Sequence, residues 1–145
     1  MANFELNEEI CEVLAQTAKK KSRELGVGVT LAVCDENGNM RLLQRFGDAI
    51  LPSLEIAPKK AYTAAVLRQS TAEFGKIAQV GESAFGINIT NDKLVIFGGG
   101  FPLKVEGKTV GGIGVSGGSV SEDETIAHTV LETFTGMVSQ LTTSP

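Results

Sequence analysis

Tryptophan is absent from this chain of 145 residues, and histidine and tyrosine each occur once. The two cysteines, Cys11 and Cys34, are distant from each other in the sequence, so they and one histidine cannot assemble a zinc centre. Both cysteines fall within apolar patterns, and residues 1–10 carry acids rather than the apolar core of a secretory signal. We therefore expect two reduced, buried thiols and no disulfide.

Long apolar runs and basic clusters are missing as well. No stretch of about 18 apolar residues exists, so we expect no segment that spans a membrane. The formal charge of −4 argues against nucleic acid, which requires a basic face, and no polybasic run is present for anionic lipid. These absences predict a cytoplasmic protein with neither nucleic acid nor a membrane as its partner.

What remains is the composition of one globular domain, which we place over residues 1–145. Hydrophobic residues make up 42% of the chain and charged residues 21%. A chain of this length buries roughly 68–70% of its extended-chain surface, which is enough for a core without disulfides or metals. The mean hydropathy is slightly positive. For so small a protein this indicates a buried subunit interface, and hence a homo-oligomer.

The first and last helices carry clear start signals. Asn7 is a good N-cap, followed by two glutamates and an apolar stripe that ends at Gly26. The sequence from Ser121 to Glu124 is a capping box and predicts the start of the last helix. One face of that helix is apolar, with Ile126, Val130, Phe134, Met137 and Leu141.

Two further helices are expected in the middle of the chain. One covers about Pro58–Gln69, with the proline in its first turn, and Ser53 is an alternative residue for its cap. A capping box that begins at Ser70 opens a short helix to about Gln79. The segment from Gly81 to Asp92 is expected to be irregular.

Five strands complete the expected fold, over Val29–Asp35, Met40–Phe46, Leu94–Phe97, Leu103–Val105 and Thr109–Ser116. Asn37-Gly38 predicts a type I′ turn between the first two, and a second hairpin turn lies around Gly107. Strands joined by hairpins are antiparallel. The fold class is therefore α/β of the α+β kind, with an antiparallel sheet of about five strands and helices packed on it.

Several motifs are better explained by structure than by chemistry. Gly112–Gly117 matches the dinucleotide pattern G-x-G-x-x-G, but these glycines lie inside an expected strand and no second parallel strand follows. Gly107-Lys108-Thr109 resembles the end of a phosphate-binding loop, but Pro102 stands where that loop requires glycine, so we interpret it as a hairpin turn. We interpret Ser116 as a hydroxyl at the end of a strand rather than as a serine nucleophile. His128 lies on the polar face of the last helix, where we expect it to be solvated; a ligand or subunit contact is the alternative.

Two features remain as candidates for binding. Nine glycines occur between Gly98 and Gly118, either for tight turns and close packing or to offer bare backbone N–H groups to an anion. A basic cluster also stands out in this acidic protein, made of Arg45, Lys59, Lys60 and Arg68. It is either ordinary solvated charge or a site for carboxylate recognition.

At these residues the chain resembles the small haem-binding and glycolate-operon proteins of the HbpS/GlcG type. The same domain forms the C-terminal half of the diol-utilisation cobalamin adenosyltransferases of the PduO type. The resemblance covers nearly the whole chain. It is carried by residues 33–38, residues 53–64, residues 98–102, residues 110–118, and Asp123 with Ala127.

The resemblance implies a profilin-like fold of α-β-α layers, a homo-oligomer that is often an octamer, haem binding in some members, and a role in glycolate, glycerol or diol metabolism. Two departures are present. The family usually has Asp-Gly-Ala after the second strand, where this chain has Gly47-Asp48-Ala49. Haem-binding relatives of the diol-utilisation type ligate iron with a first-helix histidine, and this first helix has none. The other side chains able to ligate iron are Tyr62, Lys60, Met40 and His128.

We therefore expect a binding module whose pocket lies between residues 45–63 and residues 98–118. Its ligand would be small and anionic or tetrapyrrole-like, with haem as the named cofactor. No catalytic or metal-binding residue is expected. The expected binding residues are Arg45, Asp48, Ser53, Lys59, Lys60, Thr63, Gly99, Gly100, Pro102, Ser116 and Gly117.

Two other functions stay open. In the first, the protein is a small enzyme in which Lys60 acts as a base or nucleophile, if burial lowers its pKa and an acid such as Asp48 lies beside it. In the second, it is an accessory or interaction protein for a cobalamin-dependent diol or glycerol dehydratase system, with exposed apolar surface used for assembly.

Overall fold

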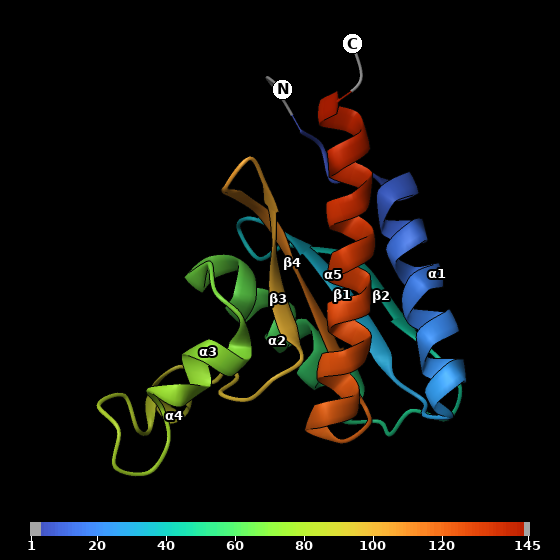
Figure 1. Cartoon of the computed structure of the whole chain (residues 1–145). Helices are drawn as coiled ribbons and strands as arrows, with labels where there is room; N and C mark the ends of the chain where they lie inside the picture. Colours follow the sequence, from blue (N-terminus) through green and yellow to red (C-terminus); the bar gives the residue numbers. More distant parts are fainter. Residues whose placement is uncertain (1–3, 144–145) are drawn as a thin grey trace.

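The structure is a computed structural model that describes residues 4–143. Its centre is a four-stranded antiparallel sheet with the order β2-β1-β4-β3 (Figure 1). The strands are β1 (Thr30–Asp35), β2 (Met40–Arg45), β3 (Gly100–Val105) and β4 (Lys108–Ser116). Helices α1 (Glu8–Leu25) and α5 (Val120–Thr143) cover one face, and α2 (Ser53–Leu67) covers the other. The expected α-β-α layers and antiparallel sheet are confirmed.

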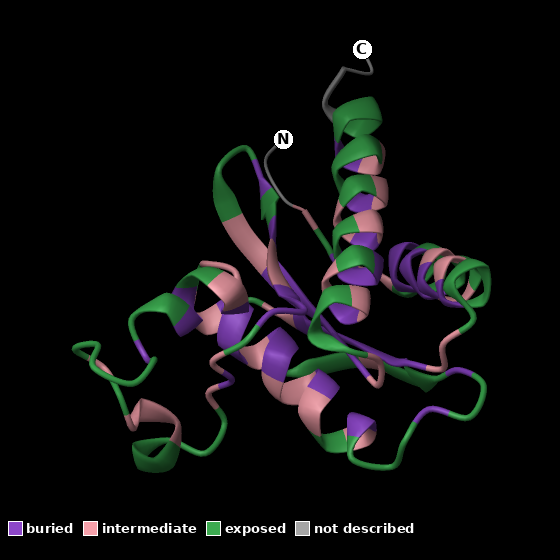
Figure 2. Ribbon diagram, turned by 60° about the horizontal axis from the view of Figure 1, so that its bottom comes forward, coloured by how far each residue is buried: buried purple, intermediate pink, exposed green. Residues whose placement is uncertain are grey.

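The two faces of the sheet are packed in different ways. Beneath α1 and α5 lies a core of large buried side chains, among them Leu14, Leu31, Ile113 and Phe134. On the other face, α2 packs on the sheet through buried alanines at positions 57, 61 and 65. Figure 2 shows buried stretches of this helix in purple. The glycines of β4 make this close approach possible. A Cβ atom added to Gly114 would collide with the backbone of α2.

Local capping fixes the ends of several helices as expected. Asn7 accepts a hydrogen bond from the backbone N–H of Ile10 at 2.9 Å, and Gly26 ends α1 with a φ of +69°. Helix α3 (Thr71–Lys76) starts after Ser70, which accepts from the N–H of Glu73 at 3.1 Å. These three signals depend on neighbouring residues only, so they are readable in the sequence.

The start of α5 differs from the expectation by two residues. The capping box belongs to Ser119 and Glu122, not to Ser121 and Glu124. The N–H of Glu122 donates to Ser119 Oγ at 3.1 Å, and the N–H of Ser119 donates to Glu122 Oε1 at 2.9 Å. Both serine-acid pairs have the same spacing, so the pattern alone does not separate them.

Helix α2 begins at Ser53, so of the two expected starts the one at Pro58 is wrong and the one near Ser53 is correct. Pro58 lies in the interior of the helix, where its missing N–H removes the bond to the carbonyl of Leu54. Ser53 does not cap the helix with its side chain; its buried hydroxyl lies 2.7 Å from the hydroxyl of Thr30 on β1. A tertiary contact therefore anchors the first turn of α2.

The β1–β2 turn is not of type I′, because only Gly38, with a φ of +84°, has positive φ there. The N–H of Gly38 donates to the carbonyl oxygen of Asp35 at 3.0 Å. The Asp35 carboxylate accepts from the N–H groups of Asn37 and Asn39 at 2.9 and 3.0 Å. The Asp35 side chain therefore stabilises a three-residue loop, where a type I′ turn would have a two-residue loop.

The expected strand over 94–97 is also wrong, and this is why the sheet has four strands rather than five. The N–H of Val95 donates to the hydroxyl of Thr63 on α2 at 3.0 Å, so it does not enter a strand ladder. The preceding segment contains the short helix α4 (Ile87–Thr90). It projects from the rest of the molecule beside α3 (Figure 1).

Candidate functional site

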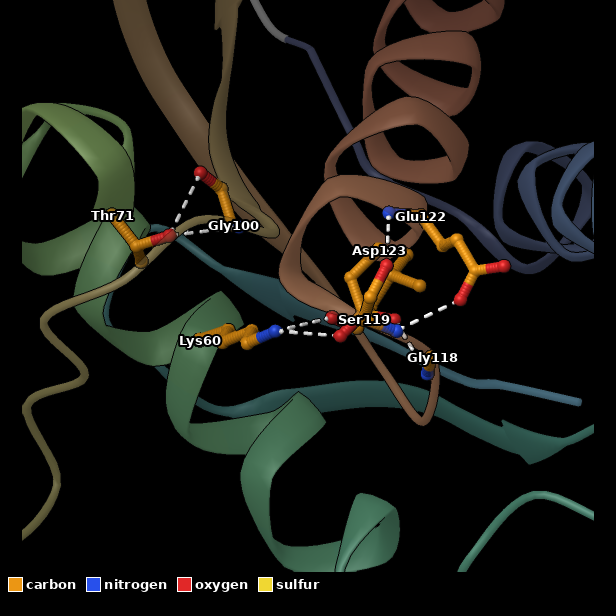
Figure 3. Close-up of polar contacts among 8 residues, drawn as sticks. Lys60, Thr71, Gly100, Gly118, Ser119, Glu122 and Asp123 are labelled. Carbon is orange, nitrogen blue, oxygen red and sulfur yellow. Dashed lines mark hydrogen bonds and ion pairs between the residues drawn. The ribbon is translucent and has the colours of Figure 1, made fainter. Parts of the chain in front are cut away.

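A buried lysine joins three elements at one corner of the sheet. Lys60 lies on α2 and has no exposed surface. Its Nζ atom donates to the carbonyl oxygen of Val115, near the end of β4, at 2.8 Å, and lies 3.2 Å from Asp123 Oδ2 in the first turn of α5 (Figure 3). The ring of Phe97 lies over the ammonium group, with its centroid at 5.2 Å. Segments 63 residues apart in the chain are thus tied together by one ion pair.

Asp123 is held in turn by the loop before α5. Its Oδ1 atom accepts from the N–H of Gly118 at 2.9 Å, and the N–H of Gly117 also favours the ionised carboxylate. Burial raises the pKa of Asp123, and the charge of Lys60 opposes that rise. Burial likewise lowers the pKa of Lys60, opposed by Asp123. Desolvation is therefore the dominant cost at this corner.

The lysine itself fills the corner that we expected to form a pocket. A Cβ atom on Gly99 would lie 2.6 Å from Lys60 Nζ, and one on Gly100 would lie 2.7 Å from the Lys60 carbonyl oxygen. The N–H of Gly100 donates to the hydroxyl of Thr71 at 2.9 Å, so this backbone group is already occupied by a contact within the protein (Figure 3). The glycines of this corner leave room for Lys60 and for backbone contacts.

Most of the other expected binding residues are part of the same packing. Ser116, which is buried, pairs across the sheet with Thr30, the partner of Ser53. Thr63 is buried and receives the N–H of Val95. Pro102 lies in β3 opposite Gly112, and Lys59 is half-buried on α2. Lys60, Gly99 and Gly117 come together as expected, but around an internal ion pair.

Arg45 and Asp48 lie apart from this corner, on a cavity of about 500 Å3 between the end of α1 and the end of β2. The guanidinium of Arg45 donates to the carbonyl oxygen of Ala49 through Nε at 2.8 Å and Nη2 at 2.6 Å. The cavity also receives Lys19 and Arg23 from α1. We call it the α1–β2 cavity; its lining is Lys19, Ser22, Arg23, Gly26, Val27, Gly28, Gln44, Arg45, Phe46, Gly47 and Asp48.

Reasoning from the sequence missed three residues at these two places in the structure. The acid beside Lys60 is Asp123, not Asp48, and nothing in the local pattern around Asp123 points to α2. Lys19 and Arg23 were not among the residues predicted to bind a ligand. Their signal is weak but present: α1 is basic in its last turn, where it meets the strand end that carries Arg45.

The side chains able to ligate iron are scattered. Lys60 is paired internally, and Met40 is 53% exposed on the edge strand β2. Tyr62 lies on α2 with the ammonium of Lys93 over its ring. His128 is exposed, and its Nδ1 atom lies 3.5 Å from Glu132 Oε1. None of them lines the α1–β2 cavity, and residues 4–143 contain no cluster of three or more metal-binding side chains.

The two cysteines lie in the protein interior, as their apolar sequence surroundings predict. Cys11 and Cys34 are both free and buried. Burial raises the pKa of both thiols, that of Cys34 to about 12. Within the described part of the chain, no helix has the length and apolar character needed to cross a bilayer.

The fold is shared with a known family. Residues 6–132 match the family described as "Haem degrading protein HbpS-like". The chain belongs to this HbpS-like family.

Individual relatives agree. The chain is 44% identical over 122 residues to an uncharacterized 15.0 kDa protein in the dhaT-dhaS intergenic region of Citrobacter freundii, covering 83% of this chain and 86% of that one. It is 40% identical over 119 residues to the corrinoid adenosyltransferase PduO of Citrobacter freundii, covering 81% of this chain but only 36% of the adenosyltransferase.

Solved structures show the same fold. The Klebsiella pneumoniae protein ORFY superimposes with a TM-score of 0.87 at 33% identity, covering 93% of this chain and 96% of that one. A structure described as a PduOC:heme complex gives a TM-score of 0.85 at 35% identity, covering 89% and 94% of the two chains.

Proposed function

We propose that the protein is an oligomeric binding domain whose α1–β2 cavity holds a small ligand that carries carboxylates, with tetrapyrroles as the named class. One observation carries this proposal: Lys19, Arg23 and Arg45 converge on one cavity, with Asp48 as its only acid among the lining residues. Its volume of about 500 Å3 falls in the range of roughly 300–1,000 Å3 typical of small-molecule sites. Arginine and lysine are well suited to carboxylates.

The similarity to a PduOC:heme complex and to HbpS supports a tetrapyrrole. A haem would bring two demands, carboxylate recognition and a ligand for iron. The cavity meets the first with three cations. For the second, no histidine, methionine, cysteine or tyrosine is among its lining residues. We therefore assign to this site recognition through the carboxylates and derive no chemistry at iron.

A homo-oligomer, with an octamer as the expected form, is the second part of the proposal. Large apolar side chains are exposed on the loop before α2 and on the projecting segment around α4. They include Leu51 at 67%, Val80 at 85% and Ile89 at 84% exposure. Apolar surface of this kind marks sites of association. Size-exclusion chromatography with light scattering should give a mass that is a multiple of the 15.2 kDa chain, and a monomer would contradict this part.

The ligand proposal is tested by titration with haemin and with iron-free protoporphyrin IX. We expect both to bind with similar affinity, because both carry the same carboxylates. Arg23→Gln should weaken both by about tenfold or more, the loss of one charge-assisted hydrogen bond. Lys76→Gln is the matched control, since Lys76 is an exposed lysine paired with Glu73 outside the cavity.

Three outcomes would contradict the proposal. The first is that neither compound binds. The second is that haemin alone binds, which would show that binding depends on iron. The third is that Arg23→Gln and Lys76→Gln weaken binding equally.

A role in glycerol or diol metabolism is part of the same proposal. It is supported by the relative encoded between dhaT and dhaS and by the PduO relative.

The enzyme hypothesis on Lys60 receives less support. Its pKa is lowered by burial and an acid lies beside it, as that hypothesis requires. A base or nucleophile must also touch its substrate, and Lys60 has no exposed surface.

An accessory function has one specific observation in its favour, the match to a C. freundii corrinoid adenosyltransferase over 36% of that protein. We propose as the alternative that the chain docks onto the machinery that supplies or uses a cobalamin cofactor. Co-purification with a PduO-type adenosyltransferase or a diol dehydratase would support it, and the absence of any complex at micromolar concentrations would contradict it.

A further inference from the structure

We propose that a second cavity, at the opposite end of α2 from its first turn, binds the phosphate group of a small phosphate monoester. It is formed by the β1–β2 turn, the C-terminal end of α2 and the β3–β4 turn, which lie at the same end of the sheet (Figure 1). We call it the hairpin cavity. Its volume is about 540 Å3, and its lining is Glu36, Asn37, Ala65, Arg68, Lys104, Gly107, Lys108 and Thr109.

Three cations from different elements meet in this cavity. Arg68 caps α2, Lys104 comes from β3, and Lys108 begins β4 after the tight turn at Gly107. Against them stands Glu36 as the one acid of the lining. In a protein with a formal charge of −4, this local excess of positive charge is unusual.

All three cations are exposed, and none of them forms an ion pair with a carboxylate of the described residues. Their charge is therefore available to a ligand. The lining also carries the hydroxyl of Thr109 and the amide of Asn37, which are neutral groups that hydrogen-bond phosphate oxygens.

The backbone at Arg68 is a second, independent sign. Arg68 ends α2 in the left-handed conformation, with a φ of 59° and a ψ of 35°. Glycine or asparagine is the usual residue at such a position, because a Cβ atom is disfavoured there. Strained non-glycine residues cluster at binding sites, where the side chain has a use that glycine cannot serve. At this site the side chain is a guanidinium on the rim of a cationic cavity.

The chemistry of the lining selects the class of ligand. Three cations suit a phosphate dianion better than a single carboxylate, and an arginine binds two phosphate oxygens at once. The Glu36 carboxylate can accept a hydrogen bond from a hydroxyl group on the same molecule. A small phosphate monoester with a free hydroxyl meets both requirements, and it does so at a site distinct from the α1–β2 cavity.

Titration of the isotope-labelled protein, followed by its amide NMR signals, tests this inference. The probes are inorganic phosphate, glycerol 3-phosphate, and sodium chloride at matched ionic strength. We expect saturable shifts at residues 107–109 and 36–37 with both phosphates, tighter for the monoester, and no saturable shifts with chloride. Failure to saturate with either phosphate up to tens of millimolar would overturn the inference.

Arg68→Gly is the most informative variant. It removes the guanidinium and relieves the positive φ, so we expect it to fold at least as well as the natural protein. Phosphate affinity should fall by about tenfold or more, with a similar fall for Lys108→Gln. Lys76→Gln is again the matched control. Equal losses in the control and the two cavity variants would show nonspecific charge attraction and reject the site.

The same measurement separates this inference from the proposal for the α1–β2 cavity. Arg23→Gln should leave phosphate binding unchanged, and Arg68→Gly should leave protoporphyrin binding unchanged. Loss of phosphate binding in Arg23→Gln would show that the anion binds in the α1–β2 cavity and would overturn the hairpin site.

Discussion

Replacing Lys60 by methionine should lower the free energy of unfolding by about 3–5 kcal/mol, the usual cost of removing one partner from a buried ion pair. Methionine keeps most of the length and volume of the side chain, so little of the loss comes from a cavity. The loss arises because Asp123, which is 3% exposed, would keep its charge without its cation. The carbonyl oxygen of Val115 would also lose its donor at 2.8 Å.

This loss is large relative to the total stability, which is about 5–15 kcal/mol for a domain. Urea denaturation followed by circular dichroism measures it, provided that the slope with urea stays constant. Lys59→Met is the matched control: it makes the same change one residue earlier on α2, where the side chain is half-buried. We expect less than about 1 kcal/mol for the control, the usual range for partly exposed positions.

A second variant shows whether the charge of Asp123 is the cause. Asp123→Asn keeps an oxygen to accept the N–H of Gly118 and removes the negative charge. The double variant Lys60→Met/Asp123→Asn should therefore be more stable than Lys60→Met alone, with a coupling of about 1–3 kcal/mol. The reasoning would be refuted if Lys60→Met cost no more than Lys59→Met, or if the second substitution added a further loss.

Three other predictions concern local features. Burial raises the pKa of the Cys34 thiol from 9.0 to about 12, so the stability that the buried thiol contributes is complete below about pH 9 and is lost toward pH 12. The native protein should therefore resist alkylation by iodoacetamide at pH 8 and react once it is unfolded. Rapid labelling of the native protein would contradict this. Gly114→Ala should cost about 1–3 kcal/mol in urea, because the new methyl meets the carbonyl of Ala57, and a value near zero would exclude that clash. Asn7→Ala should cost about 1 kcal/mol and lower Tm by about 3–5 °C in a thermal melt, since the N–H of Ile10 loses its acceptor; an unchanged Tm would argue against the cap.

Elements with local signals were predictable from the sequence. The cap at Asn7, the left-handed glycine at Gly26 and the start of α3 after Ser70 each depend on contacts within a few residues. The hairpin between β3 and β4 was predictable for the same reason. The start of α5 was off by two residues because two capping boxes overlap in the sequence.

The predictions were wrong where a residue distant in the sequence forms a contact that overrides the local secondary-structure propensity. The apolar run over 94–97 has the composition of a strand, but Thr63 on α2 takes the N–H of Val95. Pro58 favours a helix start, yet the buried contact between Ser53 and Thr30 extends α2 past it. In both cases packing against the sheet outweighs propensity, which is worth only a fraction of a kcal/mol to a few kcal/mol per residue.

The amino-acid sequence by itself determined the antiparallel sheet with helices packed on it, both ends of α1 and the start of α3. These follow from periodicity and from contacts between near neighbours, which every chain with this pattern shares. Only the tertiary structure decided that Lys60 turns inward to Asp123, and that other cations gather in two separate cavities. Those outcomes depend on which remote segments meet, and the energy of burying a charge depends on that meeting.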